Sequence, residues 1–403
     1  MSKASSADIL IQTVIDLWEA HGHAGISTRL LTQRTGVPAS SIYYHFGDME
    51  RLSVLAQDAA HKQAARWCAA QLSQIASAPS PSQTGFASLL ATLIDDWNHR
   101  ERALAFAWRE CQSLARRNPA YIPAVQAWNA MWMAFWNDLC DWIGKPDWAE
   151  PMMLFFDGES MLHLLRWRRL VDRACLDESC QGWVHMLSGH LTPEGEWRHF
   201  ARSEAERMTS PTILNGGVAE QIARAAADVM AERGLAGLTH RAVAAKAGVT
   251  LGTVSYNFRS SKDLLHGAYE VFHRHLMIEP PEDEPFKTGE RNIVQSLVES
   301  DVRMYTRLKA VCEDMFVAVA RDPSLTDFGA QLRYLRGSTG APVLQQIVGP
   351  DRLVSRFDGA LLSSFGIGQM NAVVGLSDHE AKAANYRSLT KLFALLKCHR
   401  DSR

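Results

Sequence analysis

The sequence lacks the features that would place the chain in a membrane, direct its export or build a disulfide scaffold. No apolar run reaches the roughly 18 residues that a membrane span needs, and no basic start followed by an apolar stretch predicts export. The seven cysteines are scattered and odd in number, which argues against a disulfide framework. We therefore expect a cytoplasmic protein with reduced thiols and no membrane partner.

Catalytic and metal-binding motifs are also missing. The chain has no Ser-His-Asp order and no glycine-rich phosphate loop. Cys175 and Cys180 lack the spacing of a metal or redox pair, and His273 and His275 point to different faces of a predicted helix. An enzyme alternative would have to use a set of polar side chains that no motif supports: Asp157, Glu159, His163 and Cys111. We expect no enzyme activity, no metal and no cofactor.

Strand signals are scarce, whereas 47% of the residues are apolar, which is ample for a packed helical core. At a prior of roughly 150 residues per domain, 403 residues suggest two to three domains. The predicted fold class is therefore all-α.

One segment of the chain occurs twice. Residues 26–46 return without a gap as residues 238–258, an offset of 212. Residues that recur identically are Gly22, Ala24, Gly25, Arg29, Gly36, Val37, Tyr44, Phe46 and Leu52, which return as Gly234, Ala236, Gly237, Arg241, Gly248, Val249, Tyr256, Phe258 and Leu264. The repeat predicts two copies of one small module.

Each copy is predicted to form three short helices. A glycine closes the first helix, a hydroxyl side chain caps the second, and a glycine after the second lets the third cross it steeply. In the first copy these three positions are Gly22, Ser27 and Gly36, and the third helix starts at Ala39. In the second copy they are Gly234, Thr239 and Gly248, and the third helix starts at Leu251. This is the plan of a helix-turn-helix unit.

The third helix of each copy carries small polar residues followed by aromatic ones. Short side chains allow close approach to a groove floor, and hydroxyl, imidazole and amide groups can bond to base edges or phosphates. The residues are Ala39, Ser40, Ser41, Tyr43, Tyr44 and His45 in one copy and Leu251, Gly252, Thr253, Ser255, Tyr256 and Asn257 in the other. We interpret this helix as a reader of DNA.

Both copies resemble the TetR family of transcriptional regulators. The resemblance rests on the order Ser or Thr, one residue, Arg, then Ala- or Thr-Gly-Val, then a hydrophobic residue, Tyr, His or Asn, Phe, and a Leu six residues on. It implies that the third helix enters the major groove and that the start of the second helix touches the DNA. The implied DNA-binding residues are Ser27, Thr28, Arg29, Ala39, Ser40, Ser41, Tyr43, Tyr44 and His45, with Thr239, His240, Arg241, Leu251, Gly252, Thr253, Ser255, Tyr256, Asn257 and Lys262.

The two copies differ from the family pattern and from each other. A Lys is usual three residues after the Phe, but Met49 and Ser261 stand there, with Lys262 one position late. Residues 1–65 carry a formal charge of −1 and residues 215–278 a charge of +2. Because each neutralised phosphate adds about 0.9 to the salt slope, we expect the second head to supply more of the salt-dependent affinity. A first head without DNA contact is the alternative.

The regions after the two modules also echo each other. Arg117-Asn-Pro119 matches Arg321-Asp-Pro323, and Phe156-Asp-Gly158 matches Phe357-Asp-Gly359. In the resembled family such regions bind a ligand and dimerise through a four-helix contact, which would here form within one chain. The resemblance implies a single-chain pseudo-dimer of two TetR-like units, monomeric in solution, with a first head at 1–48, a first ligand-binding and dimerisation domain at 49–208, a linker and second head at 209–260, and a second such domain at 261–403.

Helical periodicity predicts the elements of these regions. The expected helices of the first half lie at about 84–99, 101–117, 120–143, 148–172 and 177–189. Those of the second half lie at about 288–307, 308–321, 324–347, 350–376 and 378–397.

All twelve tryptophans lie in the first half, from Trp18 to Trp197. Trp128, Trp132 and Trp136 form a stripe at helical spacing, which is more often core than pocket. Flat apolar rings with a few polar handles also suit an aromatic or polycyclic effector. For that interpretation the ligand-binding residues are Trp97, Trp108, Cys111, Gln112, Trp128, Trp132 and His163.

These observations favour a ligand-responsive transcriptional regulator, with repression as the expected mode. Its partners would be a double-stranded DNA operator, read asymmetrically by two non-identical heads, and a small-molecule effector. The alternative is a small-molecule sensor that has lost DNA binding in one or both heads and acts through a protein partner.

Overall fold

The computed structural model describes residues 5–208, 216–233, 237–277, 293–295, 297–298 and 314–397. Over these residues the secondary structure is helical and contains no strand, which confirms the all-α prediction. No helix in these ranges is both long and apolar enough to cross a membrane. The chain divides into two compact units, Met1–Ser160 with Ile367–Ala381, and Met161–Gly366 with Lys382–Arg403.

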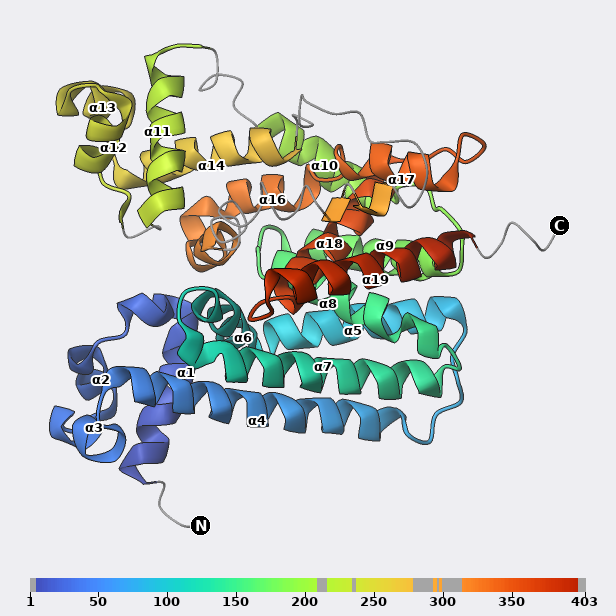
Figure 1. Cartoon of the computed structure of the whole chain (residues 1–403), viewed down its shortest axis with the longest axis horizontal. Helices are drawn as coiled ribbons and strands as arrows, with labels where there is room; N and C mark the ends of the chain where they lie inside the picture. The colour runs from blue at the N-terminus through green and yellow to red at the C-terminus, as the bar shows by residue number, and fades with distance from the viewer. Residues whose placement is uncertain are drawn as a thin grey trace. The chain divides into compact units, whose positions relative to one another are not determined.

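The first unit begins with a three-helix head. It consists of α1 (Ser6–Gly25), α2 (Thr28–Thr35) and α3 (Ala39–Phe46), which lie at one end of the long helix α4 (Met49–Ile75) (Figure 1). Leu10, Val14 and Trp18 recur at helical spacing along α1 and are buried, as are Leu31 of α2 and Ile42 of α3. The apolar stripe of α1 therefore holds the head together.

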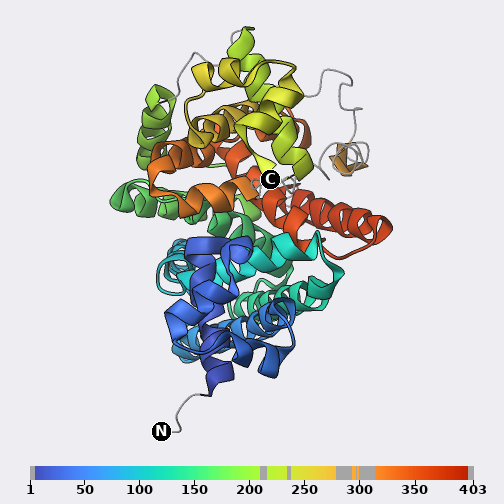
Figure 2. The same cartoon turned by 90° about the vertical axis from the view of Figure 1, so that its left-hand side faces the viewer.

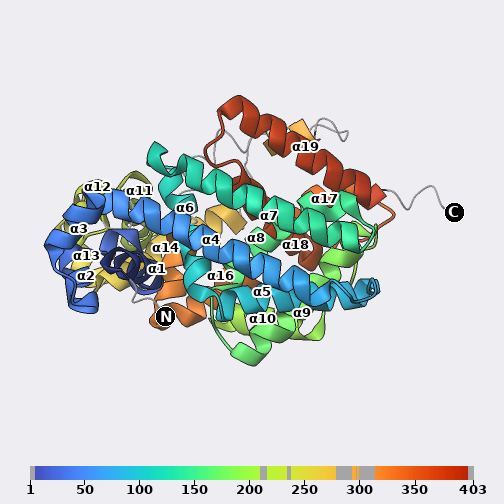
Figure 3. The same ribbon diagram turned by 90° about the horizontal axis from the view of Figure 1, so that it is seen from below.

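The body of the first unit consists of α4 and the helices that follow it. These are α5 (Gln83–His99), α6 (Arg102–Ala115), α7 (Ile122–Trp142) and α8 (Ala149–His163), with short 3₁₀ turns η1 (Pro119–Tyr121) and η2 (Pro146–Trp148). Of these helices, α6 and α7 pack against α4. Helices α4 and α7 run side by side in both Figure 1 and Figure 3. Helix α6 contacts both α1 and α4, so it connects the body directly to the head.

The second unit contains the second three-helix group. Its elements are α9 (Arg169–Leu187), α10 (Glu196–Met208), α11 (Val218–Arg233), α12 (His240–Ala247), α13 (Leu251–Asn257), α14 (Ser261–Met277), η4 (Pro323–Leu325), α16 (Thr326–Tyr334), α17 (Gly340–Val348), α18 (Arg356–Ala372) and α19 (Asp378–Lys397). Helices α11, α12 and α13 gather as one compact group (Figure 2). The start of α8 belongs to the first unit, and the end of α18 does as well.

Both units contain residues from both halves of the chain, where the first half is residues 1–208 and the second half is residues 209–403. In the first unit, Asn371 Nδ2 donates to Asp157 Oδ1 at 3.2 Å, and Arg116 Nη2 donates to Asn371 Oδ1 at 2.9 Å. Gly368 approaches Leu154 so closely that a Cβ there would lie 1.9 Å from its carbonyl oxygen. The α18 backbone therefore meets α8 at a distance that only glycine allows.

The second unit mixes the halves in the same way. Arg352 Nη2 donates to the Gly189 carbonyl oxygen at 2.8 Å, and Trp183 lies 5.8 Å from Phe365 between ring centroids. A buried cluster joins α9 and α10 of the first half to α16 of the second, through Cys175, Ala201, Ala205, Ala330, Tyr334 and Leu335. The predicted boundaries at residues 48, 208 and 260 follow the repeat rather than compactness, and they stay predictions.

Several of the expected helix boundaries are wrong, including the starts of the helices expected over 177–189 and 350–376, which begin at Arg169 and Arg356. The helix expected over 148–172 ends at His163, and α9 begins at Arg169, because Asp172 accepts a hydrogen bond from the Trp167 backbone N–H at 2.9 Å and holds a loop there. The helix expected over 324–347 is interrupted between Tyr334 and Gly340, where Gly337 has a φ of 104°. The helix expected over 288–307 lies largely outside the described residues, whereas residues 314–321 of the helix expected over 308–321 are described and helical.

The cysteines that the structure describes are buried and form no disulfide: Cys68, Cys111, Cys140, Cys175 and Cys180. Burial raises the pKa of Cys175 to about 11 and that of Cys68 to about 12. The thiols of Cys68 and Cys175 are therefore protonated at neutral pH. Cys312 and Cys398 lie outside the described residues, as do the side chains of His273 and His275.

Candidate nucleic-acid interface

The turn of the first head is built from the two residues that its sequence singles out. Ser27 caps α2, since its hydroxyl accepts a hydrogen bond from the Leu30 N–H at 3.2 Å. Gly36 ends α2 with a φ of 70°, in the left-handed region that favours glycine. Helix α3 then begins at Ala39, as predicted.

The second head repeats this geometry at the predicted offset. The Thr239 hydroxyl accepts from the Ala242 N–H at 3.2 Å, and Gly248 ends α12 with a φ of 67°. The heads differ just before the third helix, where the Thr250 hydroxyl caps α13 by accepting from the Thr253 N–H at 3.1 Å. The matching residue of the first head, Pro38, makes no side-chain cap.

The predicted end of the first helix is only partly correct. Gly22 has a φ of 60° and interrupts the helical backbone, but helical geometry resumes and α1 continues to Gly25. The glycine therefore makes a kink rather than the end of the helix. The matching Gly234 lies outside the described residues.

The third helices divide their side chains between core and surface in the same way. Ile42 and Phe46 are buried in the first head, and Val254 and Phe258 in the second. On the opposite face the predicted contact residues are exposed: Ala39, Ser40, Tyr43, Tyr44 and His45, and Leu251, Gly252, Ser255, Tyr256 and Asn257. Tyr44 and Tyr256 are 85% and 86% exposed, so the two heads present a large aromatic ring at the same position.

The start of each second helix also faces solvent. Ser27, Arg29, Thr239 and Arg241 are exposed, whereas Thr28, Ser41 and Thr253 are half-buried. The side chain of Lys262 lies outside the described residues.

Two of the predicted contacts in the second head are held by the protein itself. The His240 ring is half-buried, and its Nε2 lies 2.8 Å from the Phe258 carbonyl oxygen, which ties α12 to the end of α13. Asn257 Nδ2 donates to the Thr253 carbonyl oxygen at 2.9 Å. These bonds leave each side chain less free to turn toward DNA, and the tie made by His240 is not evident from sequence because it joins residues 18 apart.

The first head is coupled to its body through α6. Glu110 Oε2 accepts a hydrogen bond from the His23 backbone N–H at 3.0 Å, and Arg102 Nε donates to Glu19 Oε1 at 2.6 Å. A cavity of about 310 Å³ lies at this joint, lined by His23, Ile26, Met49, Glu50, Ser53, Asn118 and Tyr121. Burial lowers the pKa of His23 below its ordinary value of 6.5, against the opposing effect of Glu110 and Glu50.

The tryptophans of the predicted ligand site form a packed cluster in the first unit. Trp97, Trp108, Trp128 and Trp132 are buried, with ring centroids 5.0 to 6.4 Å apart. Since the rings fill one another's surroundings, they act as core, which is the first of the two interpretations of the stripe. A ligand among these rings stays a prediction.

The polar handles of that predicted site belong to different units. Gln112 Nε2 donates to Asp157 Oδ2 at 3.2 Å, and Cys111 is buried, with its pKa raised by burial. His163 belongs to the second unit, where its Nδ1 lies 2.6 Å from Arg333 Nη2.

Asp157 stands in a buried network of the first unit. Arg109 Nη1 contacts Asp157 Oδ1, Arg109 Nη2 donates to the Asp157 carbonyl oxygen at 2.8 Å, and the Arg109 guanidinium lies over the Trp108 ring at 4.2 Å. Gln112 and Asn371 donate to the same carboxylate. These groups occupy the oxygens of Asp157, so the residue links α6, α8 and α18. This structural role differs from that of a catalytic carboxylate, which the enzyme alternative would require.

Comparison with known families identifies one of the two heads. Residues 222–268 match the family model described as bacterial regulatory proteins, tetR family, a range that runs from α11 into α14. No curated protein matches the chain. The match covers the second copy of the repeat, and the corresponding residues 10–56 of the first copy are not included in it. Residues 222–268 are thus similar to the DNA-binding head of bacterial regulatory proteins of the tetR family, and the helices α11 to α14 over this range fit a helix-turn-helix head.

Proposed function

We propose that this chain is a ligand-responsive transcriptional repressor whose two halves act as the two subunits of a pseudo-dimer. The observation that carries the proposal is the repetition of one head geometry at an offset of 212 residues. The cap, the left-handed glycine and the exposed tyrosine recur as Ser27, Gly36 and Tyr44 and as Thr239, Gly248 and Tyr256.

The mixing of the two halves supports a dimer made within one chain. A TetR-like dimer needs helices of two subunits in one bundle, and here α8 meets α18 while α9 meets α18 and α16. In the proposed function the chain itself supplies both subunits. A solution mass of 44.9 kDa rather than twice that value is expected.

Repression and its release follow from head spacing in this proposal. A pair of third helices reads successive major grooves when they stand roughly 34 to 36 Å apart on one face of DNA. An effector that binds the body more tightly in a state with another spacing shifts the population toward that state. The contacts of α6 with α1, through Glu110 and Arg102, are the route by which a change in the first body reaches the first head.

The operator is proposed to be asymmetric because the exposed residues of the two third helices differ. Ala39 and Ser40 stand where Leu251 and Gly252 stand in the second head, and Tyr43 corresponds to Ser255. Each half-site would then be read by a different set of side chains. A footprint over a perfect palindrome would contradict this part of the proposal.

A gel-shift titration tests DNA binding. The probe is the DNA that adjoins the gene of this chain, and the titration is repeated at several salt concentrations. Arg241→Ala is expected to weaken binding by about 1 to 3 kcal/mol if Arg241 contacts a base. Arg29→Ala tests the first head in the same way. Arg166→Ala, a change at an exposed arginine between α8 and α9, is the matched control and should leave affinity unchanged. If neither head variant weakens binding, or no shift occurs at low salt, the proposal is wrong.

The alternative is a sensor in which the first head no longer contacts DNA. The formal charge of −1 over residues 1–65 and Met49 at the usual lysine position favour it. In that case Arg241→Ala would weaken binding while Arg29→Ala would not, and the footprint would cover one half-site. If both heads have lost DNA binding, the chain would act through a protein partner and no operator would be protected in a footprint.

A further inference from the structure

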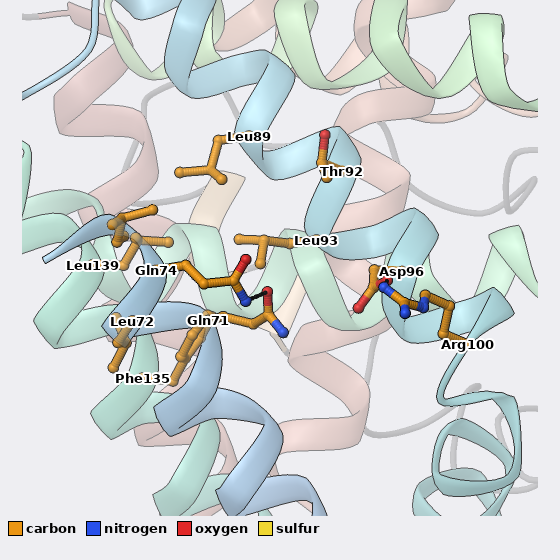
Figure 4. A pocket seen from close by; sticks show the side chains of 11 residues that line it. Gln71, Leu72, Gln74, Leu89, Thr92, Leu93, Asp96, Arg100, Phe135 and Leu139 are labelled. Carbon is orange, nitrogen blue, oxygen red and sulfur yellow. Dashed lines mark hydrogen bonds and ion pairs between the residues drawn. The ribbon is translucent and has the colours of Figure 1, made fainter. Parts of the chain in front are cut away.

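An open pocket lies in the first unit, away from the tryptophan core. It has a volume of about 230 Å³ and lies between the C-terminal end of α4, the middle of α5 and the second half of α7 (Figure 4). Its lining includes the apolar side chains of Leu93, Phe135 and Leu139 and the charged side chains of Asp96 and Arg100.

The floor of the pocket is apolar and firmly placed. Leu93, Phe135 and Leu139 are buried side chains that line it. Phe135 lies 6.1 Å from Trp67 and 6.0 Å from Trp132 between ring centroids, so the floor is the edge of the aromatic core. An apolar group seated there would gain contact with fixed side chains rather than with mobile ones.

The polar side of the pocket has one fixed charge and one loosely held charge. Trp67 Nε1 donates to Asp96 Oδ2 at 3.0 Å, which fixes the carboxylate. Arg100 Nη1 approaches Asp96 Oδ1 at 3.4 Å, and the Arg100 side chain is 81% exposed while that of Asp96 is 20% exposed. An exposed ion pair of this kind contributes little to stability, so a ligand cation can replace the Arg100 guanidinium at Asp96 Oδ1.

We propose that this pocket binds a small apolar molecule that carries a protonated amine, with the amine on Asp96 and the apolar part on Leu93, Phe135 and Leu139. This inference rests on the proposed function, for which it names the class of effector. The volume lies below the roughly 300 Å³ at which pockets for drug-sized ligands begin, so the ligand has a single ring or a short chain. An acidic ligand would face the fixed carboxylate of Asp96.

Calorimetric titration of the full chain without DNA tests the proposal. The probes are 2-phenylethylamine, the matched alcohol 2-phenylethanol and the acid phenylacetate. The amine is expected to bind about tenfold more tightly than the alcohol, and phenylacetate more weakly still. Tryptophan emission should change as the amine binds, because Trp67 is bonded to Asp96. Equal affinity for amine and alcohol, or a preference for phenylacetate, would overturn the proposal.

Two substitutions are expected to change the affinity for the amine in opposite directions. Asp96→Asn keeps an oxygen for Trp67 and should weaken amine binding about tenfold, whereas Arg100→Gln frees Asp96 and should strengthen it. Asp58→Asn is the matched control, because Asp58 pairs with Lys62 across one exposed helical turn. Since the Arg100 side chain is exposed, Arg100→Gln keeps the test valid even if Asp96→Asn fails to fold. Weaker amine binding in Arg100→Gln would contradict the assignment.

The proposed function and this inference fail in different experiments. Absence of any gel shift would disprove DNA binding and would leave the calorimetric result standing. The amine could bind at Asp96 without releasing the operator. That result would show a ligand site that is not the effector site, and it would overturn the assignment of the effector.

Discussion

Single residues in the two turns could be predicted from sequence because their roles are local. A hydroxyl cap and a left-handed glycine depend on two or three neighbouring residues, and Ser27, Gly36, Thr239 and Gly248 take these roles in the structure. The bond of His240 to Phe258 joins separate helices, so no local rule indicates it.

The turn glycines give a matched pair of stability predictions. Gly36 and Gly248 have positive φ angles and no atom within 4 Å of a built Cβ, so the cost of alanine there is conformational rather than steric. Gly36→Ala and Gly248→Ala should each lower the free energy of unfolding by about 1 to 2 kcal/mol, measured by denaturant titration.

Gly366→Ala is the control for this pair, because Gly366 lies inside α18 without a positive φ and also has open space around it. Alanine there should be neutral or stabilising by up to about 1 kcal/mol. An equal loss at all three positions would show that the turn conformation is not the cause.

His23 predicts a pH dependence of stability. Burial lowers its pKa in the folded state below 6.5, so the unfolded chain binds the proton more readily. The free energy of unfolding should therefore fall as pH decreases below about 6.5, and His23→Gln should make this fall smaller. His61, whose pKa burial also lowers, would keep the remainder. The same pH series on His21→Gln, at an exposed position, should match the unchanged chain.

At the scale of elements, the helices with an apolar stripe were predictable and the breaks between them were not. The caps and turn glycines place α2 and α3 correctly, but α1 continues past Gly22, and the ends of α8 and α16 depend on Asp172 and Gly337. The tryptophan stripe predicted both a core and a ligand site. The pocket at its edge was not predicted, because it brings together α4, α5 and α7.

The ion pair of Arg109 and Asp157 joins α6 to α8, and Asn371 of α18 donates to the same carboxylate. The side chains of the pair are 1% and 7% exposed, so Arg109→Met would leave a buried carboxylate without its cation. The expected loss is about 3 to 5 kcal/mol in the free energy of unfolding, measured by denaturant titration. Adding Asp157→Leu should recover part of it, because no buried charge then remains. If the double variant is no more stable than the single one, packing rather than charge sets the loss.

At the scale of the molecule, the repeat predicted two heads, whereas the mixing of the halves could only be expected by resemblance. Sequence patterns give no distance between residues such as Asp157 and Asn371, which are 214 apart. The match to residues 222–268 confirms one head as TetR-like, and the first head shares its geometry without being part of that match.

A chain cut after residue 208 tests how far the halves depend on each other. It lacks Ile367–Ala381, which complete the first unit, so it should bind a hydrophobic dye and elute as an expanded or aggregated species. Coexpression with residues 209–403 should restore a compact complex. A compact, protease-resistant 1–208 on its own would show that the α18 segment adds nothing essential.

Cells that hold one altered and one normal copy of the gene are expected to behave as if only the normal copy mattered. In regulators that assemble from identical separate subunits, a defective subunit forms mixed dimers with normal subunits and inactivates them. In the proposed pseudo-dimer the glycine of α18 sits against α8 of its own polypeptide, so defective and normal molecules would not exchange parts. Loss-of-function alleles of this chain should therefore be recessive.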